Sequence, residues 1–183
     1  MKWFQLIDAA DDRSWAISVP PEQFDDPKKV WEFSAGKLVQ VLEPIHLRMQ
    51  QGNERDFSLT GFSIPVVTSR FREVVETLCP NEVQFFSATG VGKMQLSILN
   101  IPVSLDVIDY KNSTVQLCMN RGRAFRERYG KPEMVSKLVI KKNDLGGRSI
   151  FRVKDWRPAI IVNAKLKDAL VDAAVTGIYF SEV

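Results

Sequence analysis

An internal repeat at a fixed offset of 95 residues constrains the fold of this 183-residue chain more than any other feature of its sequence. Residues 67–75 and residues 162–170 carry basic, apolar, basic and acidic side chains in the same order, and the match needs no gap. The similarity continues into an apolar stretch at residues 83–85 in the first copy and 178–180 in the second. A repeat of this kind indicates one supersecondary unit that is used twice.

Each copy of the repeat predicts a strand, a short helix and a second strand. A β-rich lead-in reaches a helix-capping residue, which is Thr68 or Ser69 in the first copy and Asn163 in the second. Apolar residues then recur at the helical spacing i, i+3, i+4 and i+7. They are Phe71, Val74, Val75 and Leu78, and in the second copy Leu166, Ala169, Leu170 and Ala173. We therefore expect two similar strand–helix–strand units, at about residues 64–87 and 159–182.

The remainder of the chain reads mostly as β-structure. Short runs rich in β-branched and aromatic residues predict strands at residues 2–7, 14–19, 37–42, 95–100, 103–108 and 115–119. Residues 28–33 fit either a strand or a single helical turn. Residues 137–140 and 149–153 flank Asn143-Asp144-Leu145-Gly146-Gly147, a pattern typical of a β-hairpin. The predicted fold class is α+β, with a mixed or antiparallel sheet and few short helices.

The composition is that of a soluble globular protein, with 45% hydrophobic and 26% charged residues. No apolar run approaches the about 20 residues needed to cross a bilayer. The apolar stretch at the N-terminus is too short and too soon charged for a signal peptide. Cys79 and Cys118 stand in apolar surroundings, which favours buried, reduced thiols over a disulfide. We expect a single cytoplasmic domain over residues 1–183.

Charge is distributed unevenly along the chain, whose formal net charge is +3. Residues 1–60 hold seven Lys and Arg against ten Asp and Glu. Residues 111–154 hold twelve Lys and Arg against three acidic residues, a local charge of +9. Such asymmetry bears on the choice of partners rather than on the fold.

Few residues suggest catalysis or metal binding. His46 is the only histidine and is flanked by apolar residues, so we expect it to be structural. One histidine and two distant cysteines do not make a zinc site from nearby ligands, and no nucleophile-elbow motif is present. Asp106 and Asp109 would lie on opposite faces of a strand, unless a turn begins between them. We expect no catalytic residue, no metal site and no cofactor.

Three groups of residues are candidates for binding a partner. Arginines and aromatic residues alternate in residues 121–131, a pattern that fits a solvated surface, a protein-binding site or a grip on nucleic acid. A Trp-Arg pair follows further on, and both types are enriched in binding hot spots, although tryptophan is equally a core residue. Acidic residues near the N-terminus would suit a basic partner, and the basic stretch an acidic one. The candidate residues are Arg121, Arg123, Arg126, Arg128, Trp156, Arg157, Asp11, Asp12, Asp25 and Asp26.

Several short motifs occur in a characteristic order. Asp56-Phe57 comes first, followed by the first repeat helix and Val83-Gln84-Phe85-Phe86. Ile98-Leu99-Asn100 and residues 103–109 come next, and Ile150-Phe151-Arg152 and Gly177-Ile178-Tyr179-Phe180 complete the series. This order resembles immunity protein family eleven of bacterial polymorphic toxin systems. The resemblance covers about residues 37–183, so residues 1–55 are expected to be a more variable part and residues 56–183 a family-like core.

The resemblance implies a protein that neutralises a cognate secreted toxin by direct stoichiometric binding. It supplies no catalytic residues, and none is expected from the residue types and spacings of the sequence. The alternative hypothesis is a nucleic-acid-binding module that uses the basic segment 111–154, whose affinity would fall steeply with salt. Nucleic acid is the less favoured partner, because no RNA-binding signature accompanies the basic segment.

Overall fold

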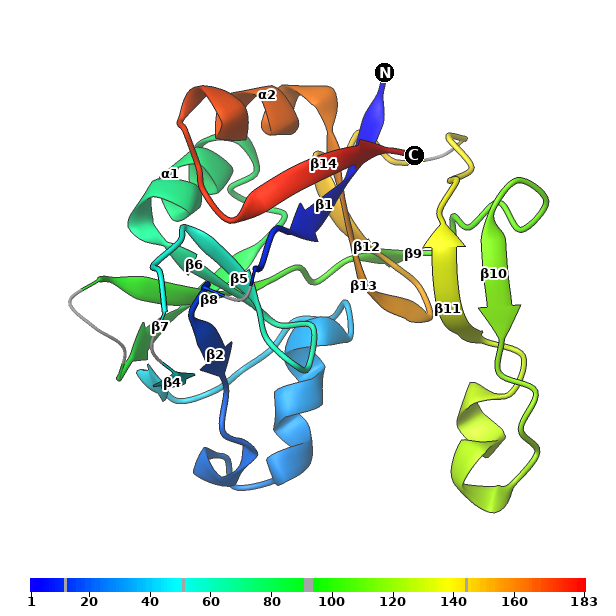
Figure 1. Cartoon of the computed structure of the whole chain (residues 1–183), viewed down its shortest axis with the longest axis horizontal. Coiled ribbons are helices and arrows are strands. Elements are labelled where there is room, and N and C mark those ends of the chain that lie inside the picture. Colours follow the sequence, from blue (N-terminus) through cyan, green and yellow to red (C-terminus); the bar gives the residue numbers. More distant parts are fainter. Residues whose placement is uncertain (12, 51, 91–93, 144) are drawn as a thin grey trace.

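The computed structural model describes residues 1–11, 13–50, 52–90, 94–143 and 145–183. Two five-stranded sheets dominate this part of the chain (Figure 1). The first has the order β3 (Ile45–His46), β7 (Gln84–Thr89), β8 (Leu96–Asn100), β6 (Pro65–Thr68) and β5 (Phe57–Leu59). The second has the order β14 (Ile178–Glu182), β1 (Trp3–Asp8), β13 (Trp156–Asn163), β12 (Ile150–Val153) and β9 (Ser104–Leu105).

Two smaller strand pairs and a few short helices complete the fold. The pairs are β2 (Ala16–Ser18) with β4 (Arg48–Gln50), and β10 (Thr114–Leu117) with β11 (Pro132–Lys137). The α-helices are α1 (Ser69–Leu78) and α2 (Ala164–Asp172), and the 3₁₀-helices are η1 (Pro21–Gln23), η2 (Pro27–Ser34) and η3 (Arg123–Arg128). The predicted α+β class, with mixed and antiparallel pairing, is confirmed.

The repeated strand–helix–strand unit is also confirmed. The first unit is β6–α1–β7 and the second is β13–α2–β14, and the offset of 95 residues aligns the first helical residues, Ser69 and Ala164. In both units the two strands lie on either side of a central antiparallel strand, which is β8 in the first unit and β1 in the second. The N-terminal strand therefore has to insert between β13 and β14 to complete the second unit.

The two helices bury their apolar faces in one core that both sheets share. At equivalent repeat positions Phe71 and Leu166 are fully buried, as are Val75 and Leu170. Removing an apolar side chain of this size from water stabilises a fold by about 1.5–3 kcal/mol. The helical spacing seen in the sequence thus corresponds to the faces that join the two units.

The two helices begin in different ways. The side-chain oxygen of Asn163 accepts a hydrogen bond from the Leu166 N–H at 2.8 Å, so the predicted cap of α2 is confirmed. Thr68 occupies the equivalent position before α1, but its hydroxyl makes no bond to the helix. That hydroxyl instead donates to Asp56 Oδ1 at 2.6 Å. The expectation of a side-chain cap on α1 was wrong because Asp56 competes for the capping group.

Asp56 links the two units through its buried carboxylate. Besides the bond from Thr68, its Oδ2 accepts from the N–H of Thr176 at 2.9 Å and from the Thr176 hydroxyl at 2.8 Å. Arg70 Nη1 approaches the same oxygen at 3.2 Å. Burial by itself raises the pKa of Asp56, but the hydrogen bonds and the Arg70 charge outweigh burial and lower the pKa below the ordinary 3.8. The carboxylate is therefore charged in the folded protein at neutral pH.

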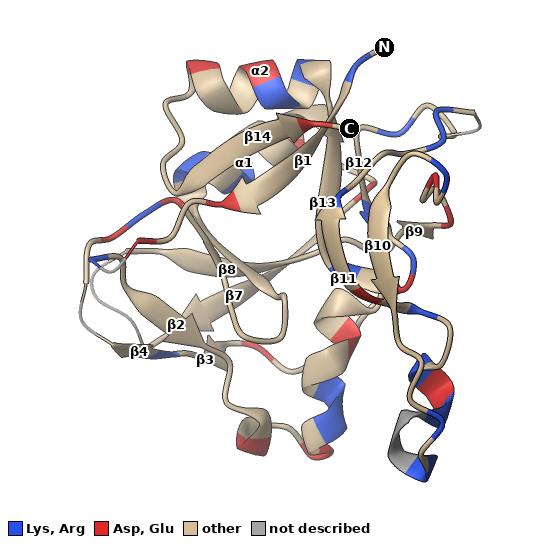
Figure 2. Cartoon of the chain, turned by 45° about the vertical axis from the view of Figure 1, so that its right-hand side comes forward, with Lys and Arg blue, Asp and Glu red and all other residues tan. Residues whose placement is uncertain are grey.

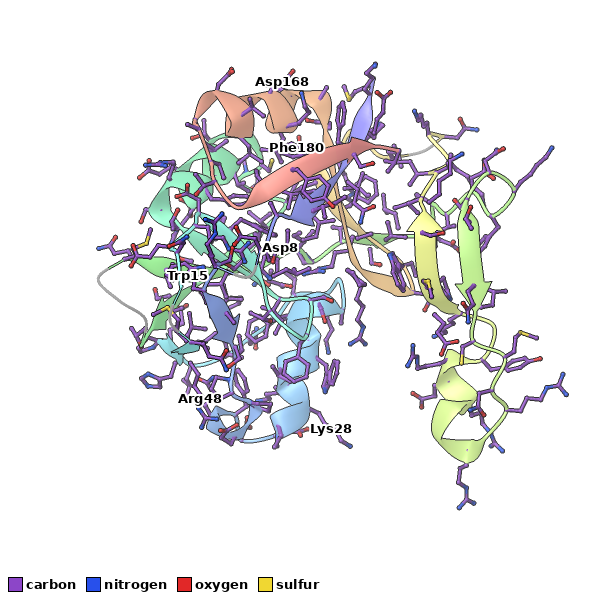
Figure 3. All side chains as sticks on the ribbon, viewed as in Figure 1. Asp8, Trp15, Lys28, Arg48, Asp168 and Phe180 are labelled. Carbon is purple, nitrogen blue, oxygen red and sulfur yellow. The ribbon has the colours of Figure 1, made fainter. Side chains whose placement is uncertain are left out.

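The backbones of the two units pass close together beside this carboxylate. Gly177 has φ +83°, and an added Cβ would lie 2.4 Å from the Phe57 carbonyl oxygen. Arg55 Nη1 pairs with Asp8 Oδ1 at 2.6 Å, and both side chains are largely buried. Asp8 lies in the middle of the molecule (Figure 3), and its second oxygen accepts from the Leu59 N–H at 2.7 Å. The N-terminal strand is thereby fixed to the first unit as well as to the second.

Two predicted elements differ from the structure. Residues 37–42 form no strand; the Gln84 side chain instead bonds the backbone N–H and carbonyl of Val39 at 3.0 and 3.2 Å. Residues 137–140 and 149–153 form no hairpin, because β11 pairs with β10 while β12 pairs with β13 and β9. All four residues of β12 are buried, so that strand needs partners on both sides. Residues 28–33 belong to η2 rather than to a strand.

The two cysteines behave as predicted. Cys79 and Cys118 are both buried and unbridged. Burial raises the pKa of Cys79 to about 11, so its thiol stays protonated at neutral pH. Within the described ranges the structure holds no helix of the length and apolarity that a membrane span requires.

We predict that Asp56→Asn lowers the free energy of unfolding by about 2–4 kcal/mol at pH 7, because hydrogen bonds to a charged group are lost at a buried site. The folded-state pKa of Asp56 lies below its unfolded value, so the contribution is complete above about pH 5 and is lost as the pH falls below about 4. Urea unfolding of both proteins at pH 7 and pH 3.5 measures this difference. Asp168→Asn, on the exposed face of α2, is the control and should change stability by less than about 0.5 kcal/mol. A loss at Asp56 no larger than in the control, or one independent of pH, would contradict the assignment.

Candidate partner-binding site

Residues 114–137 form an arm that stands to one side of the two sheets (Figure 1). β10 and β11 make its hairpin and η3 lies at its tip. Val115 and Val135 pair across the hairpin and pack against the core beneath the second sheet. The Ser113 hydroxyl bonds both the N–H and the carbonyl of Val139, at 2.9 and 3.0 Å. The base of the arm is therefore attached to the body while its tip projects (Figure 2).

A cleft of about 570 Å³ lies between this arm, η2 and the turn that joins β12 to β13. Its walls carry two tryptophans, two arginines, one lysine and two carboxylates. The lining residues are Trp31, Glu127, Arg128, Lys131, Pro132, Asp155, Trp156, Arg157 and Pro158. Three segments that are distant in sequence thus build one site, which we call the arm cleft.

The turn from β12 to β13 positions one wall of the arm cleft. Val153 pairs with Trp156, so Lys154 and Asp155 form a two-residue turn. Asp155 has φ +62°, a left-handed conformation that Asp tolerates better than most residues. Its carboxylate meets Lys131 Nζ of the arm at 3.1 Å. This half-exposed ion pair contributes at most about 1 kcal/mol to stability, but it ties the arm to the turn.

Trp31 lines the arm cleft from η2. The residue is 46% exposed, and its ring packs edge-on against Phe62 at 4.6 Å between ring centroids. The Arg157 guanidinium lies over the Trp31 ring, 5.7 Å from its centroid. Contacts of this kind are worth about 0.5–1 kcal/mol at exposed sites. Trp31 therefore presents a partly exposed apolar surface that lies beneath the Arg157 guanidinium.

Arg152 lies beneath the arm cleft and is 1% exposed. Its Nη1 donates to the Arg157 carbonyl at 2.7 Å, and its Nη2 donates to the carbonyls of Ser63 at 3.1 Å and Phe33 at 3.3 Å. Nε has no protein partner among the described residues. Burial, and secondarily the Arg157 charge, lower the pKa of Arg152 to about 10. Arg152 is thus a buried cation that joins η2, the loop between β5 and β6, and the start of β13.

The structure brings together three of the predicted partner-binding residues, Arg128, Trp156 and Arg157, in the arm cleft. Arg121 lies further along the arm, where its guanidinium stacks on Tyr129 at 5.2 Å from the ring centroid. Arg123 and Arg126 are exposed on η3. The basic and aromatic candidates therefore form one continuous region, the cleft together with the arm.

The acidic candidates form no such region. Asp11 bonds the Ser14 hydroxyl at 2.6 Å, Asp25 pairs with Lys29 at 2.7 Å, and Asp26 caps η2 through the Lys28 N–H at 2.9 Å. Asp12 lies outside the described residues. Three of the four predicted acidic residues thus make local bonds at separate positions.

Two further hollows contain titratable residues. One of about 630 Å³ is lined by Asp25, His46 and the exposed loop around Leu42, and His46 Nδ1 lies 3.1 Å from the Thr89 hydroxyl. A smaller one of about 270 Å³ lies over Asp56 and Arg70. Asp109 accepts from the Asn112 side chain and from backbone N–H groups in its own turn. In the described part of the chain no three His, Cys, Asp or Glu residues cluster as metal ligands would.

Sequence reasoning missed Trp31 and Asp155 as residues of the site. Trp31 belongs to residues 28–33, for which the sequence allowed either a strand or a helical turn. The exposure of its side chain could therefore not be predicted. Arg152 was counted in the basic segment, although Ile150, Phe151 and Val153 around it form an apolar run that indicates burial. That run is the signal which separates this arginine from the exposed ones.

The comparisons with known proteins agree with the order of motifs. The model of the Immunity protein family (Imm11) matches residues 7–183. The match starts well before residue 37, so it includes the N-terminal segment that contributes Trp31. No curated protein matches the chain.

Arg152 on β12 and Arg157 on β13 test whether one arginine is structural while the other belongs to the surface of the arm cleft. We predict that Arg152→Ala lowers the free energy of unfolding by about 3 kcal/mol or more, since the carbonyls of Phe33, Ser63 and Arg157 lose their donor in the interior. Arg157→Ala should cost less than about 1 kcal/mol, because its side chain is exposed. Urea unfolding of the two variants measures the contrast. Equal losses would show that the two arginines do not divide into a structural and a surface role.

Proposed function

Because the chain belongs to the immunity protein family Imm11, we propose that it neutralises a cognate bacterial toxin by direct, stoichiometric binding. The toxin would be bound in the cytoplasm of the cell that makes both proteins. No bond of the toxin would be made or broken, so the chain acts as an inhibitor rather than an enzyme.

The observation that carries this proposal, beside the family itself, is the arm cleft. Protein-binding hot spots are rich in tryptophan and arginine and lie on rigid supports. Trp31, Trp156 and Arg157 stand on η2 and on a sheet hairpin, and the buried Arg152 connects these two elements. The arm adds a second wall that reaches beyond the body. Such a surface can be held ready for a partner without further folding.

The alternative of a nucleic-acid-binding module receives less support. The basic segment 111–154 does not form one surface, because Arg152 is buried and Lys131 is paired with Asp155. Glu127 and Asp155 also line the cleft and would repel phosphates. The arginines that remain exposed on the arm are Arg121, Arg123, Arg126 and Arg128.

The family resemblance implies that the toxin is encoded beside this chain, so co-expression with the C-terminal domain of a toxin-like protein encoded there tests the proposal. We predict that cells survive and that the two proteins co-purify as a one-to-one complex in high salt. A standard interface would bury roughly 1,600 Å² in total. Cell death without any complex would refute the proposal.

Substitution of the titratable residues tests the non-enzymatic part. We predict that His46→Ala, Asp106→Ala and Asp109→Ala leave survival unchanged, because none of these residues lies in the arm cleft. Circular dichroism of each variant verifies folding. Loss of protection in a folded variant would favour an enzymatic mechanism instead.

A further inference from the structure

Two of the acidic candidates, Asp11 and Asp25, lie beside cations of their own, whereas the arginines of the arm and the arm cleft have no carboxylate partner among the described residues. Asp25 pairs with Lys29, and Asp11 lies 3.9 Å from Arg13. Glu22 likewise pairs with Arg48. Among the described residues no carboxylate lies within 4.0 Å of the guanidinium groups of Arg123, Arg126, Arg128 and Arg157. Residues 114–137 hold six Lys and Arg against Glu127 and Glu133, so the charge that the arm offers to a partner is positive on balance.

Arg152 adds positive charge from below the cleft. Its hydrogen-bond acceptors are three neutral carbonyls, one of which belongs to Arg157. A buried charge is screened less by solvent and salt than an exposed one. A negative group bound at Arg157 would therefore be attracted by the exposed guanidinium and by the buried one behind it.

The two tryptophans give the cleft an apolar part beside its charges. Trp31 and Trp156 both line it, and Trp31 is nearly half exposed. A volume of about 570 Å³ falls in the range of about 300–1,000 Å³ that is typical of sites for compact ligands. The cleft thus suits a few side chains at the tip of a loop.

The carboxylates of the cleft argue for a protein occupant rather than nucleic acid. Glu127 and Asp155 lie on the same walls as the arginines. A nucleic acid carries a negatively charged phosphate at every nucleotide, so its backbone would bring negative charge close to both carboxylates. A protein loop can offer carboxylates to Arg128 and Arg157 and N–H groups to Glu127 and Asp155.

We propose that the arm cleft binds an acidic loop of the toxin, with carboxylates that pair with Arg128 and Arg157 and an apolar side chain that packs on Trp31 and Trp156. Arg121, Arg123 and Arg126 on the arm extend the same positive surface along the toxin. This inference rests on the proposed function, and it specifies which face of the toxin is covered.

Carbodiimide cross-linking of the co-purified complex tests the proposal, because this reagent joins a lysine amine to a carboxylate in direct contact. Arg128→Lys and Arg157→Lys place an amine at each proposed contact. We expect both variants to form cross-links to Asp or Glu of the toxin. Arg13→Lys, beside Asp11 and outside the arm cleft, is the matched control and should form no cross-link to the toxin. The native pair Lys131–Asp155 should cross-link in the free chain and so confirms that the reagent reaches the cleft.

Charge reversal gives a second readout. Arg128→Glu with Arg157→Glu should weaken toxin binding by about a hundredfold or more, at about tenfold for each lost charge pair. Asp11→Lys with Asp25→Lys should change binding by less than about threefold. Unfolding in urea shows that the reversed variants are folded.

The outcomes separate this inference from the proposed function. If wild-type protein forms no complex, the proposed function fails. If a complex forms but positions 128 and 157 yield no cross-link and charge reversal does not weaken it, the acidic-loop proposal alone is overturned. Retention of a 20-base-pair DNA or RNA duplex at low salt, lost in the Arg128→Glu and Arg157→Glu variant, would also overturn it and assign the surface to nucleic acid.

Discussion

The buried carboxylate of Asp56 is the interaction on which the rest of the structure depends. It accepts hydrogen bonds from Thr68 at the start of the first repeat helix and from Thr176 after the second. Neither repeat unit can shift against the other without breaking a charge-assisted bond in the interior. The Arg55–Asp8 pair fixes the N-terminal strand to the first unit near this carboxylate. The backbones of the two units also approach each other closely there, at Gly177 and Phe57. The shared apolar core supplies most of the stabilising free energy, while these polar contacts determine one arrangement of the two units.

Arg152 transmits this arrangement to the surface. Its guanidinium donates to the carbonyls of Phe33, Ser63 and Arg157, which fixes η2 and the start of β13 relative to each other. Trp31 and Arg157 stand on these two elements, so the geometry of the arm cleft follows from a buried charge. The arm is attached by the Ser113–Val139 bonds and by the Lys131–Asp155 pair. The proposed binding surface is thus rigid on the side of the body and more lightly held on the side of the arm.

The local elements could be predicted from the sequence where a periodic pattern is repeated, and the long-range pairings could not. Helical spacing identified Phe71 and Val75 and their counterparts as core residues, and the repeat supported both helices. Nothing local indicates that β1 inserts between β13 and β14, because that pairing joins opposite ends of the chain. The expected hairpin around Gly146 and Gly147 failed for the same reason: turn residues show that the chain reverses, but the fully buried strand β12 takes its partners from the sheet.

The candidate site could be predicted only in part. Residue types typical of hot spots pointed to Arg128, Trp156 and Arg157. Trp31 was not predicted, because residues 28–33 fitted a strand as well as a helical turn. The acidic candidates could not be set aside before the structure showed their partners, such as Lys29 for Asp25.

A titration of toxin activity against the amount of this chain is the most direct test of the central claim, that protection results from stoichiometric binding. If binding is stoichiometric, toxin activity falls linearly and reaches its minimum at one chain per toxin molecule, whatever the incubation time. Complete inactivation by a small fraction of an equivalent, progressing with time, would instead show that the chain acts catalytically.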